Sequence, residues 1–410
     1  MKRWIKNTRT VALCLIPIGL VTAFSNSWSN KIPISCVGSS GVKPFVESLS
    51  KEYMKANKKV DITVEAGGSG FGIQQISQGF ANIGNASKDP YSAVYGKDDK
   101  GTDGFRSQWE KNKIKTITIG WEAICMVYIP PKELNLNPDE LNNILVVNNS
   151  NVCNLMRIFS GINSNVTDAT LGNFYNDQAD LTPSQQQLLM NTSIIPYVRA
   201  GGSLTSGTAS SFVGGTHLNF NEKNDLTVAQ QNAFDSGYYG TKFGLVQTDE
   251  ANSRAWDIFA KNNKPGQIVY LSSGFVKQNL DLIKSKGYGI MAYDGSETQT
   301  NPTSFDVNFI DSHDGYNWFR PLNLMIPVTN NESFTTEMNF IKTLLSDEYK
   351  NKLIEIGAKY LNTEEIEQIF PNDISGIWKS DYQLAKEKEA DWNWPKDYNF
   401  APIPSGISDN

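Results

Sequence analysis

Short apolar stretches of strand-like composition alternate along the chain with segments in which apolar residues recur three and four positions apart. Residues 31–37 (KIPISCV) and 60–66 (VDITVEA) predict β-strands. Residues 42–57 predict a helix between them, with Pro44 in its first turn, and residues 71–79 predict the next helix. This repetition of strand and helix is typical of an α/β protein.

The same pattern predicts the remaining elements. Further strands are expected at 114–120, 123–129, 193–199, 287–293 and 322–328. Asn-rich polar stretches at 131–151 and 217–231 predict loops, and residues 334–361 predict one long helix. The tail from residue 362, which is rich in Trp and Asp, predicts no particular element.

The length and charge of the chain narrow its class. At 410 residues it exceeds the size at which a single hydrophobic core stops growing, which predicts two lobes. The net charge of −6, with no Lys/Arg run beyond the N-terminus, predicts no nucleic-acid partner. A small anion stays open as a ligand, because local dipoles hold such ligands whatever the overall charge.

The N-terminus has the layout of a secretory signal. A basic start is followed by an apolar run from Val11 to Phe24 and then by a polar Ser/Asn stretch. This layout predicts export, with residues 1–30 either cleaved or kept as a membrane anchor. Cys14 lies inside the apolar run, which makes it a poor site for lipid attachment. The alternative is a buried N-terminal helix.

Three more cysteines follow, Cys36, Cys125 and Cys153. Their odd number and wide spacing argue against a disulfide framework. They are expected to be small buried hydrophobic residues. A single bridge between Cys125 and Cys153 is the alternative.

Glycines crowd the turn before the helix predicted at 71–79. They surround Ser69 and stand at 67, 68, 70 and 72. Their spacing fits neither the G-x-G-x-x-G nucleotide fingerprint nor the phosphate P-loop. The turn shares with both motifs a set of backbone N–H groups that converge at a helix N-terminus and attract an anion. A β-carbon at Gly70 or Gly72 is then expected to crowd the ligand or forbid a positive φ. The alternative is a tight turn whose serine caps the helix.

Three other stretches combine glycine with hydroxyl residues. They are VGSSGVKPF (37–45), GNASKDP (84–90) and VRAGGSLTSGTASSF (198–212), and the last adds Arg199. Each alone is compatible with a simple helix cap, because Ser and Thr are preferred cap residues. Together they predict one anion site built from several segments of the chain.

In order and spacing these motifs resemble the substrate-binding protein of the phosphate ABC transporter. The matching segments are GSSGVKP (38–44), GSGFGI (68–73), NIGNAS (82–87) and Arg199 followed by SGTASSF (206–212), with weaker matches at 155–161, 287–293 and 320–324. The resemblance implies a two-lobed α/β periplasmic-binding-protein fold of type II. In this fold each lobe is a central sheet flanked by helices, and two hinge crossovers, near 119–124 and 319–324, join the lobes. The parts it implies are a signal or anchor (1–30), lobe one (31–119 plus 322–402), lobe two (120–321) and a tail (403–410).

The resemblance also implies a ligand and its contacts. Inorganic phosphate would be bound between the lobes of a monomeric, exported protein that is either anchored at the extracellular face of the cell membrane or in the periplasm. It would then be delivered to the membrane permease subunits of an ABC importer, with no cofactor or metal. Lobe one would contribute Ser39, Ser40, Gly41, Val42, Ser69, Gly70 and Ser87. Lobe two would contribute Arg199, Ser206, Gly207 and Thr208.

Two departures from the family pattern affect these assignments. Ser87 stands where some members have a carboxylate that accepts a hydrogen bond from protonated phosphate and so rejects sulfate; here Asp89 or a remote acid would have to take that role. Residues 203–205 are an insertion in the arginine loop. An alternative register makes Ser203 and Thr205 the ligands, but it loses the match at Phe212.

Enzymatic functions find little support in the sequence. The histidines are His217 and His313, and neither is near a Gly-x-Ser-x-Gly elbow. The loop at 311–318 contains two aspartates but is more typical of a solvated polar loop than of a metal site. The alternatives to phosphate uptake are a receptor for another small oxyanion, a surface adhesin and a phosphohydrolase on the same scaffold.

Overall fold

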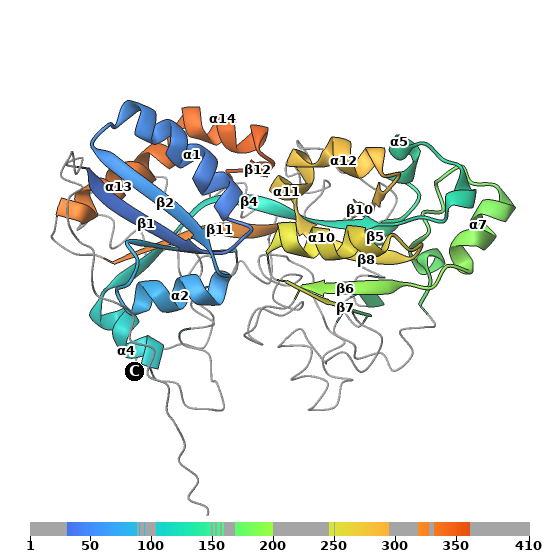
Figure 1. The fold of residues 1–410 in the computed structure, drawn as a ribbon, viewed down its shortest axis with the longest axis horizontal. Helices are drawn as coiled ribbons and strands as arrows, with labels where there is room; N and C mark the ends of the chain where they lie inside the picture. Colours follow the sequence, from blue (N-terminus) through green and yellow to red (C-terminus); the bar gives the residue numbers. More distant parts are fainter. Residues whose placement is uncertain are drawn as a thin grey trace, which may run out of the picture.

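The computed structural model describes residues 31–87, 104–148, 169–199, 246–249, 251–294, 319–327 and 332–360, together with 90, 94, 151, 154–155 and 158–159. These residues form a two-lobed α/β fold, and the strands β4 (Ile114–Tyr128) and β11 (Phe319–Pro327) run between its halves (Figure 1). The predictions for the signal segment, the loop at 217–231 and the tail lie outside these residues. Within the described part of the chain, no helix is both long and apolar enough to cross a membrane.

The first half is built on three neighbouring strands. β1 (Ile32–Gly38) pairs in parallel with β2 (Val60–Ala66) on one side and with β3 (Ile83–Ala86) on the other. The helices α1 (Lys43–Ala56) and α2 (Ser69–Ser77) connect them. Both predicted strands and the first helix are confirmed, whereas α2 begins two residues before the predicted start at 71. Because the strands are parallel, the loops that follow them meet at one edge of the sheet.

β4 is one continuous strand of 15 residues, although the sequence predicts a break at Trp121 and Glu122. Both residues are buried. They pair with Pro321 and Arg320 of β11, which lies antiparallel to β4. The predicted break is therefore wrong, because tertiary pairing carries the strand through a stretch with weaker strand pattern.

The second half continues from the carboxyl half of β4. Its strands are β5 (Val146–Asn148), β6 (Ile195–Arg199), β7 (Val246–Thr248), β8 (Gln267–Ser272), β9 (Gly289–Ile290) and β10 (Ala292–Asp294). Its helices are η1 (Lys132–Leu134), α5 (Pro138–Leu141), η3 (Leu171–Phe174), α7 (Pro183–Met190), α10 (Asn252–Asn262), α11 (Ser273–Gln278) and α12 (Leu280–Ser285). β8 is antiparallel to β4 and parallel to β6, which is parallel to β7.

The stretch at 131–151 is not the continuous loop that its Asn content predicts, since it contains η1, α5 and β5. Asn137 causes part of the difference, because its side chain forms a capping box with Glu140 at the start of α5. The strand predicted at 287–293 is divided at Met291 into β9, which pairs with β4, and β10, which pairs with β5.

The predicted helix at 334–361 is also divided. It consists of α13 (Glu332–Leu344) and α14 (Asp347–Glu355), followed by the short strand β12 (Ala358–Lys359). Ser346 has extended backbone angles and is the N-cap of α14, and Asp347 and Glu348 lie in the first turn. Ser followed by two acidic residues is a helix-start signal that the apolar period alone does not show.

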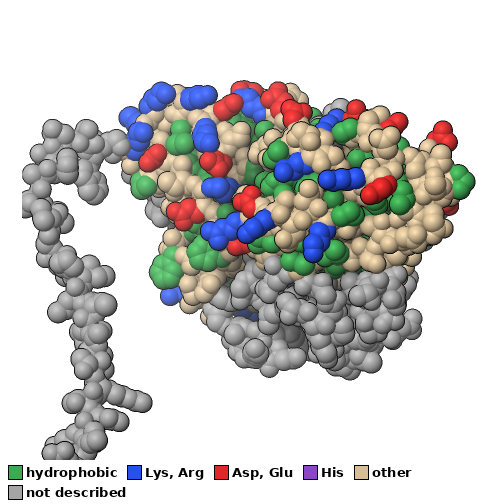
Figure 2. Space-filling view, turned by 45° about the vertical axis from the view of Figure 1, so that its right-hand side comes forward, with side chains coloured by type: hydrophobic (Ala, Val, Ile, Leu, Met, Phe, Trp, Pro, Cys, Tyr) green, Lys and Arg blue, Asp and Glu red, His purple; other side chains and the backbone are tan. Residues whose placement is uncertain are grey.

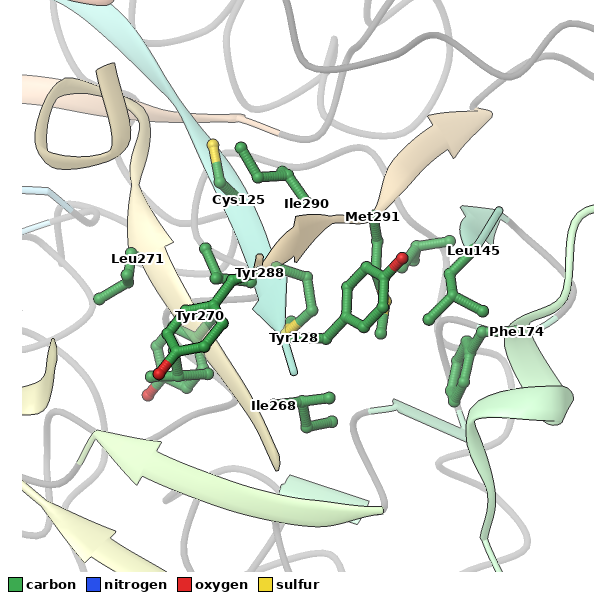
Figure 3. Close-up of a cluster of buried hydrophobic side chains, with 14 of the residues drawn as sticks. Cys125, Tyr128, Leu145, Phe174, Ile268, Tyr270, Leu271, Tyr288, Ile290 and Met291 are labelled. Carbon is green, nitrogen blue, oxygen red and sulfur yellow. The ribbon is translucent and has the colours of Figure 1, made fainter. Parts of the chain in front are cut away.

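Two large buried clusters form the cores of the halves. One joins β1, β2 and α1 to β11, α13 and α14. The other surrounds the carboxyl half of β4, and its members include Tyr128, Tyr270, Tyr288 and Phe174 (Figure 3). A small third cluster joins α2 to α4 (Gly104–Lys111). The exact lobe boundaries stay a prediction.

The cysteines Cys36 and Cys125 are buried and free, as the sequence predicts. The alternative bridge from Cys125 to Cys153 is therefore wrong. Burial raises the pKa of the Cys36 thiol to about 12, and a hydrogen bond from Asn85 opposes this effect. Burial likewise raises the pKa of Cys125 well above its usual range.

Candidate functional site

Three serines from the first half form one buried hydrogen-bond network at the carboxyl edge of the sheet. The hydroxyls of Ser39 and Ser87 lie 2.8 Å apart. Ser87 N donates to Ser69 Oγ over 3.1 Å, and Gly41 N donates to Ser39 Oγ over 3.1 Å. The three loops that follow β1, β2 and β3 are thus held together by their own polar groups.

Two helices begin in these loops, and the residues that the structure describes give neither of them a side-chain cap. α1 follows Val42, and α2 starts at Ser69 after Gly68. Ser69 is inside the helix, and its hydroxyl accepts the bond from Ser87 N, so the alternative of a serine cap is wrong for this turn. The first N–H groups of a helix have no acceptor within it, and they carry the positive end of the helix dipole. In α1 the N–H groups of Lys43, Phe45 and Val46 already donate to Ser39 O and Val42 O. The start of α2 is therefore the one that presents its first N–H groups to this edge, while α1 adds the positive end of its dipole.

The glycines of the loop after β2 have roles other than those that the sequence predicts. The positive φ is at Gly68, at +93°, whereas Gly70 and Gly72 lie within α2. A β-carbon on Gly72 would lie 2.5 Å from Asn85 O and 2.8 Å from Gly38 Cα. Gly72 thus permits the close packing of α2 on the sheet, and the prediction of a positive φ at Gly70 or Gly72 is wrong.

Arg199 reaches this network from the second half. It is the last residue of β6, is 4% exposed, and its Nη2 donates to Ser40 Oγ over 3.2 Å. Tyr270 of β8 supports it twice, since its ring lies 5.5 Å from the guanidinium carbon and its hydroxyl donates to Arg199 O over 2.9 Å. A residue 159 positions away in sequence is thereby brought to the loop after β1.

A buried ion pair that the sequence analysis missed lies behind the loop after β1. Arg320 Nε donates to Glu122 Oε1 over 2.8 Å, and both side chains are buried. A β-carbon on Gly41 would overlap Glu122 Oε1 and lie 2.9 Å from Arg320 Nη2. Burial raises the pKa of Glu122, and the charges of Arg320 and Arg199 oppose this effect. The sequence holds no local signal for this pair, because it depends on the register of two antiparallel strands that are far apart in the chain.

The structure brings eight predicted site residues to one place. Seven come from the first half and one from the second, namely Ser39, Ser40, Gly41, Val42, Ser69, Gly70, Ser87 and Arg199. The other predicted residues, Ser206, Gly207 and Thr208, lie outside the described part of the chain, as do Asp89, Ser203, Thr205 and Phe212.

The groups that meet here are mainly donors, which suits an oxyanion. Hydroxyls, helix-start N–H groups and one guanidinium can each donate to an anion oxygen. On the face seen in Figure 2, Lys and Arg side chains are interspersed with Asp and Glu, which does not favour a polyanion partner on that face. The geometry therefore fits a small anion enclosed by the fold.

The chain matches a family model described as a PBP superfamily domain over residues 25–346. It is 30% identical over 383 residues to an uncharacterized lipoprotein of Mycoplasma genitalium, which covers 88% of this chain and 93% of that protein. It is also 39% identical to the phosphate-binding protein PstS of Bacillus subtilis over 66 residues, 16% of this chain and 20% of that protein.

Solved structures with a similar fold include a Clostridium perfringens protein with bound phosphate, with a TM-score of 0.49 and 19% identity. The match covers 80% of this chain and all of that one (100%). An ABC-type phosphate transport receptor from Vibrio cholerae has a TM-score of 0.46 and 18% identity, with the same coverage of 80% and 100%.

Proposed function

The chain belongs to the PBP superfamily, and on that premise we propose that it binds inorganic phosphate outside the cytoplasm and delivers it to the permease subunits of an ABC importer. The observation that carries this proposal is the reach of Arg199 to Ser40, beside three buried serines. The partial similarity to a phosphate-binding protein supports the same ligand. The protein is a binding component and not an enzyme.

The donor set matches the needs of a dehydrated phosphate. Its four oxygens can accept many hydrogen bonds, and a bond to a charged partner contributes roughly 1.5–3 kcal/mol. Half a dozen such bonds exceed the roughly 8 kcal/mol that corresponds to micromolar affinity. The remainder offsets dehydration of the anion and closure of the protein around it.

Closure in this proposal joins the two lobes across the ligand. The residues of 31–119 supply the serine network and two helix starts, and the segment 120–321 supplies Arg199. Ser206, Gly207 and Thr208 are proposed to add donors from the same side as Arg199. Hinge closure around a ligand is a common motion of two-lobed binding proteins.

The proposal places the protein at the cell surface or in the periplasm. The basic and apolar start of the sequence supports export. The similarity to a lipoprotein supports attachment to the membrane as well. Association with permease subunits follows from a role in uptake.

Titration calorimetry of the purified protein with phosphate, sulfate and arsenate tests the ligand. Stoichiometric binding of phosphate, with sulfate at least about tenfold weaker, is the expected result. Absence of phosphate binding, or equal affinity for sulfate, contradicts the proposal. A chromogenic phosphate ester, incubated with the same preparation, tests for hydrolysis, which is expected to be absent.

A further inference from the structure

Three buried charged side chains converge behind the loop that follows β1. Glu122 of β4 and Arg320 of β11 are opposite each other in antiparallel register and form an ion pair of 2.8 Å. Arg199 of β6 is the third, and it lies near enough for its charge to lower the pKa of Glu122. The single carboxylate among these three groups is therefore paired with one guanidinium group and within electrostatic reach of a second.

The carboxylate of Glu122 lies against the anion site. Because a β-carbon on Gly41 would overlap Glu122 Oε1, only the absence of a side chain lets the loop pass so close to the carboxylate. The N–H of Gly41 donates to Ser39 Oγ within the serine network. The negative charge thus lies in direct contact with a loop that the proposed function assigns to the ligand.

The second oxygen of the same carboxylate indicates a role beyond stability. Glu122 Oε2 is buried, and no group in the described part of the chain donates to it with normal geometry. A hydrogen bond with the Ser272 hydroxyl lowers the pKa of Glu122, but by less than Arg320 and Arg199 do. Burying an incompletely paired carboxylate is unfavourable, so well-packed apolar residues in place of both Glu122 and Arg320 would stabilise the fold at least as well as the pair does.

We propose that Glu122 and Arg320 set the charge that the site accepts, so that a singly charged oxyanion binds in preference to a doubly charged one. Glu122 repels each charge on the ligand, and salt screens this repulsion little inside a closed site. The repulsion is therefore greater for sulfate than for dihydrogen phosphate. Arg320 holds the carboxylate in place and limits its field. The inference rests on the proposed function and names the residues that determine specificity at that site.

The test compares phosphate and sulfate by calorimetry at several pH values from mildly acidic to neutral, because phosphate is mainly singly charged at the lower end and Glu122, whose pKa burial raises, is more fully ionised at the upper end. Glu122→Gln keeps an oxygen that can accept from Arg320 but removes the charge. It is expected to tighten sulfate binding by at least about fivefold and to tighten phosphate binding less. Arg320→Met is expected to weaken sulfate binding more than phosphate binding. The double variant Glu122→Gln/Arg320→Met, which restores the charge balance, is expected to return the ratio of the two affinities towards that of the wild type.

Glu52→Gln is the matched control, because Glu52 pairs with Lys352 on α14, away from the serine network, and undergoes the same chemical change. It is expected to leave both affinities unchanged, and thermal melts of all variants report their folding. The proposal is overturned, while phosphate binding stands, if Glu122→Gln leaves the ratio of the phosphate and sulfate affinities unchanged. It is also overturned if Glu122→Gln and Arg320→Met each weaken the binding of both anions to the same degree. A wild-type protein that binds neither anion overturns the proposed function as well.

Discussion

The hydroxyls of Ser39 and Ser87 lie 2.8 Å apart, although 48 positions separate them in the sequence. Each hydroxyl has one proton, so the bond between them uses one and leaves the other for a ligand oxygen. The bond also fixes the loops after β1 and β3 before any ligand arrives. A site that is ordered in advance loses less conformational entropy on binding, which favours high affinity from few contacts.

Arg199→Lys is expected to weaken phosphate binding by about tenfold or more, because an ammonium group cannot make the two parallel bonds that a guanidinium makes. Calorimetry measures the affinity, and a thermal melt is expected to change little. Arg254→Lys is the control, since Arg254 is exposed and makes a surface ion pair with Asp249. An unchanged affinity in Arg199→Lys would show that the arginine is structural.

Ser69→Ala is expected to cost about 1–3 kcal/mol of phosphate binding, because the Ser69 hydroxyl accepts from Ser87 N and keeps its own proton for a ligand oxygen, which the variant leaves unmatched. The measurement is titration beside a thermal melt. Ser285→Ala, which removes an exposed hydroxyl bonded to Leu282 O, is expected to change neither quantity. Loss of stability with normal affinity in Ser69→Ala would assign this serine to the fold alone.

Cys36 predicts a fall in stability at high pH. The thiol has a pKa of about 12 in the folded protein and an ordinary value of 9.0. Between these values the unfolded chain has lost the proton and the folded chain keeps it, so stability is full below pH 9 and decreases as pH rises by up to about 1.4 kcal/mol per unit. Urea unfolding at several alkaline pH values measures this slope. Cys36→Ala is expected to reduce it, and an equal slope in that variant contradicts the assignment.

The local elements of the first half follow from the sequence alone, because their apolar periods agree with their tertiary environment. β2 has the predicted bounds, and α1 begins within one residue of its prediction. The predictions are wrong where pairing with a distant segment determines the secondary structure. Pairing with β11 carries β4 through Trp121 and Glu122, and no local period contains that information.

The candidate site was predictable in part for the same reason. Serines and glycines after parallel strands are brought together by the sheet itself, so their positions could be predicted as a group. The role of Arg199 could be predicted because the order and spacing of the motifs resemble those of the phosphate substrate-binding proteins. The partnership of Glu122 and Arg320 depends on the register between two crossovers, and a single sequence does not give that register.

Gly41→Ala tests whether the loop after β1 needs its close approach to the ion pair. The new β-carbon would overlap Glu122 Oε1, so either the carboxylate or the loop must move. Since Arg320 and the strand pairing hold the carboxylate, the loop is expected to shift, and phosphate affinity is expected to fall by about 1–3 kcal/mol, as for overpacking in a core.

Gly79→Ala is the control for adding a methyl group. Gly79 has a φ of +76°, and no atom lies within 4 Å of the place that a β-carbon would take. This change is therefore expected to cost about 1–2 kcal/mol of stability through backbone strain and nothing in affinity. Titrations and thermal melts should thus distinguish the two variants, because Gly41→Ala is expected to lose mainly phosphate affinity and Gly79→Ala mainly stability. Normal phosphate affinity in Gly41→Ala would mean that the loop adapts without loss, and that its glycine does not position the donors of the site.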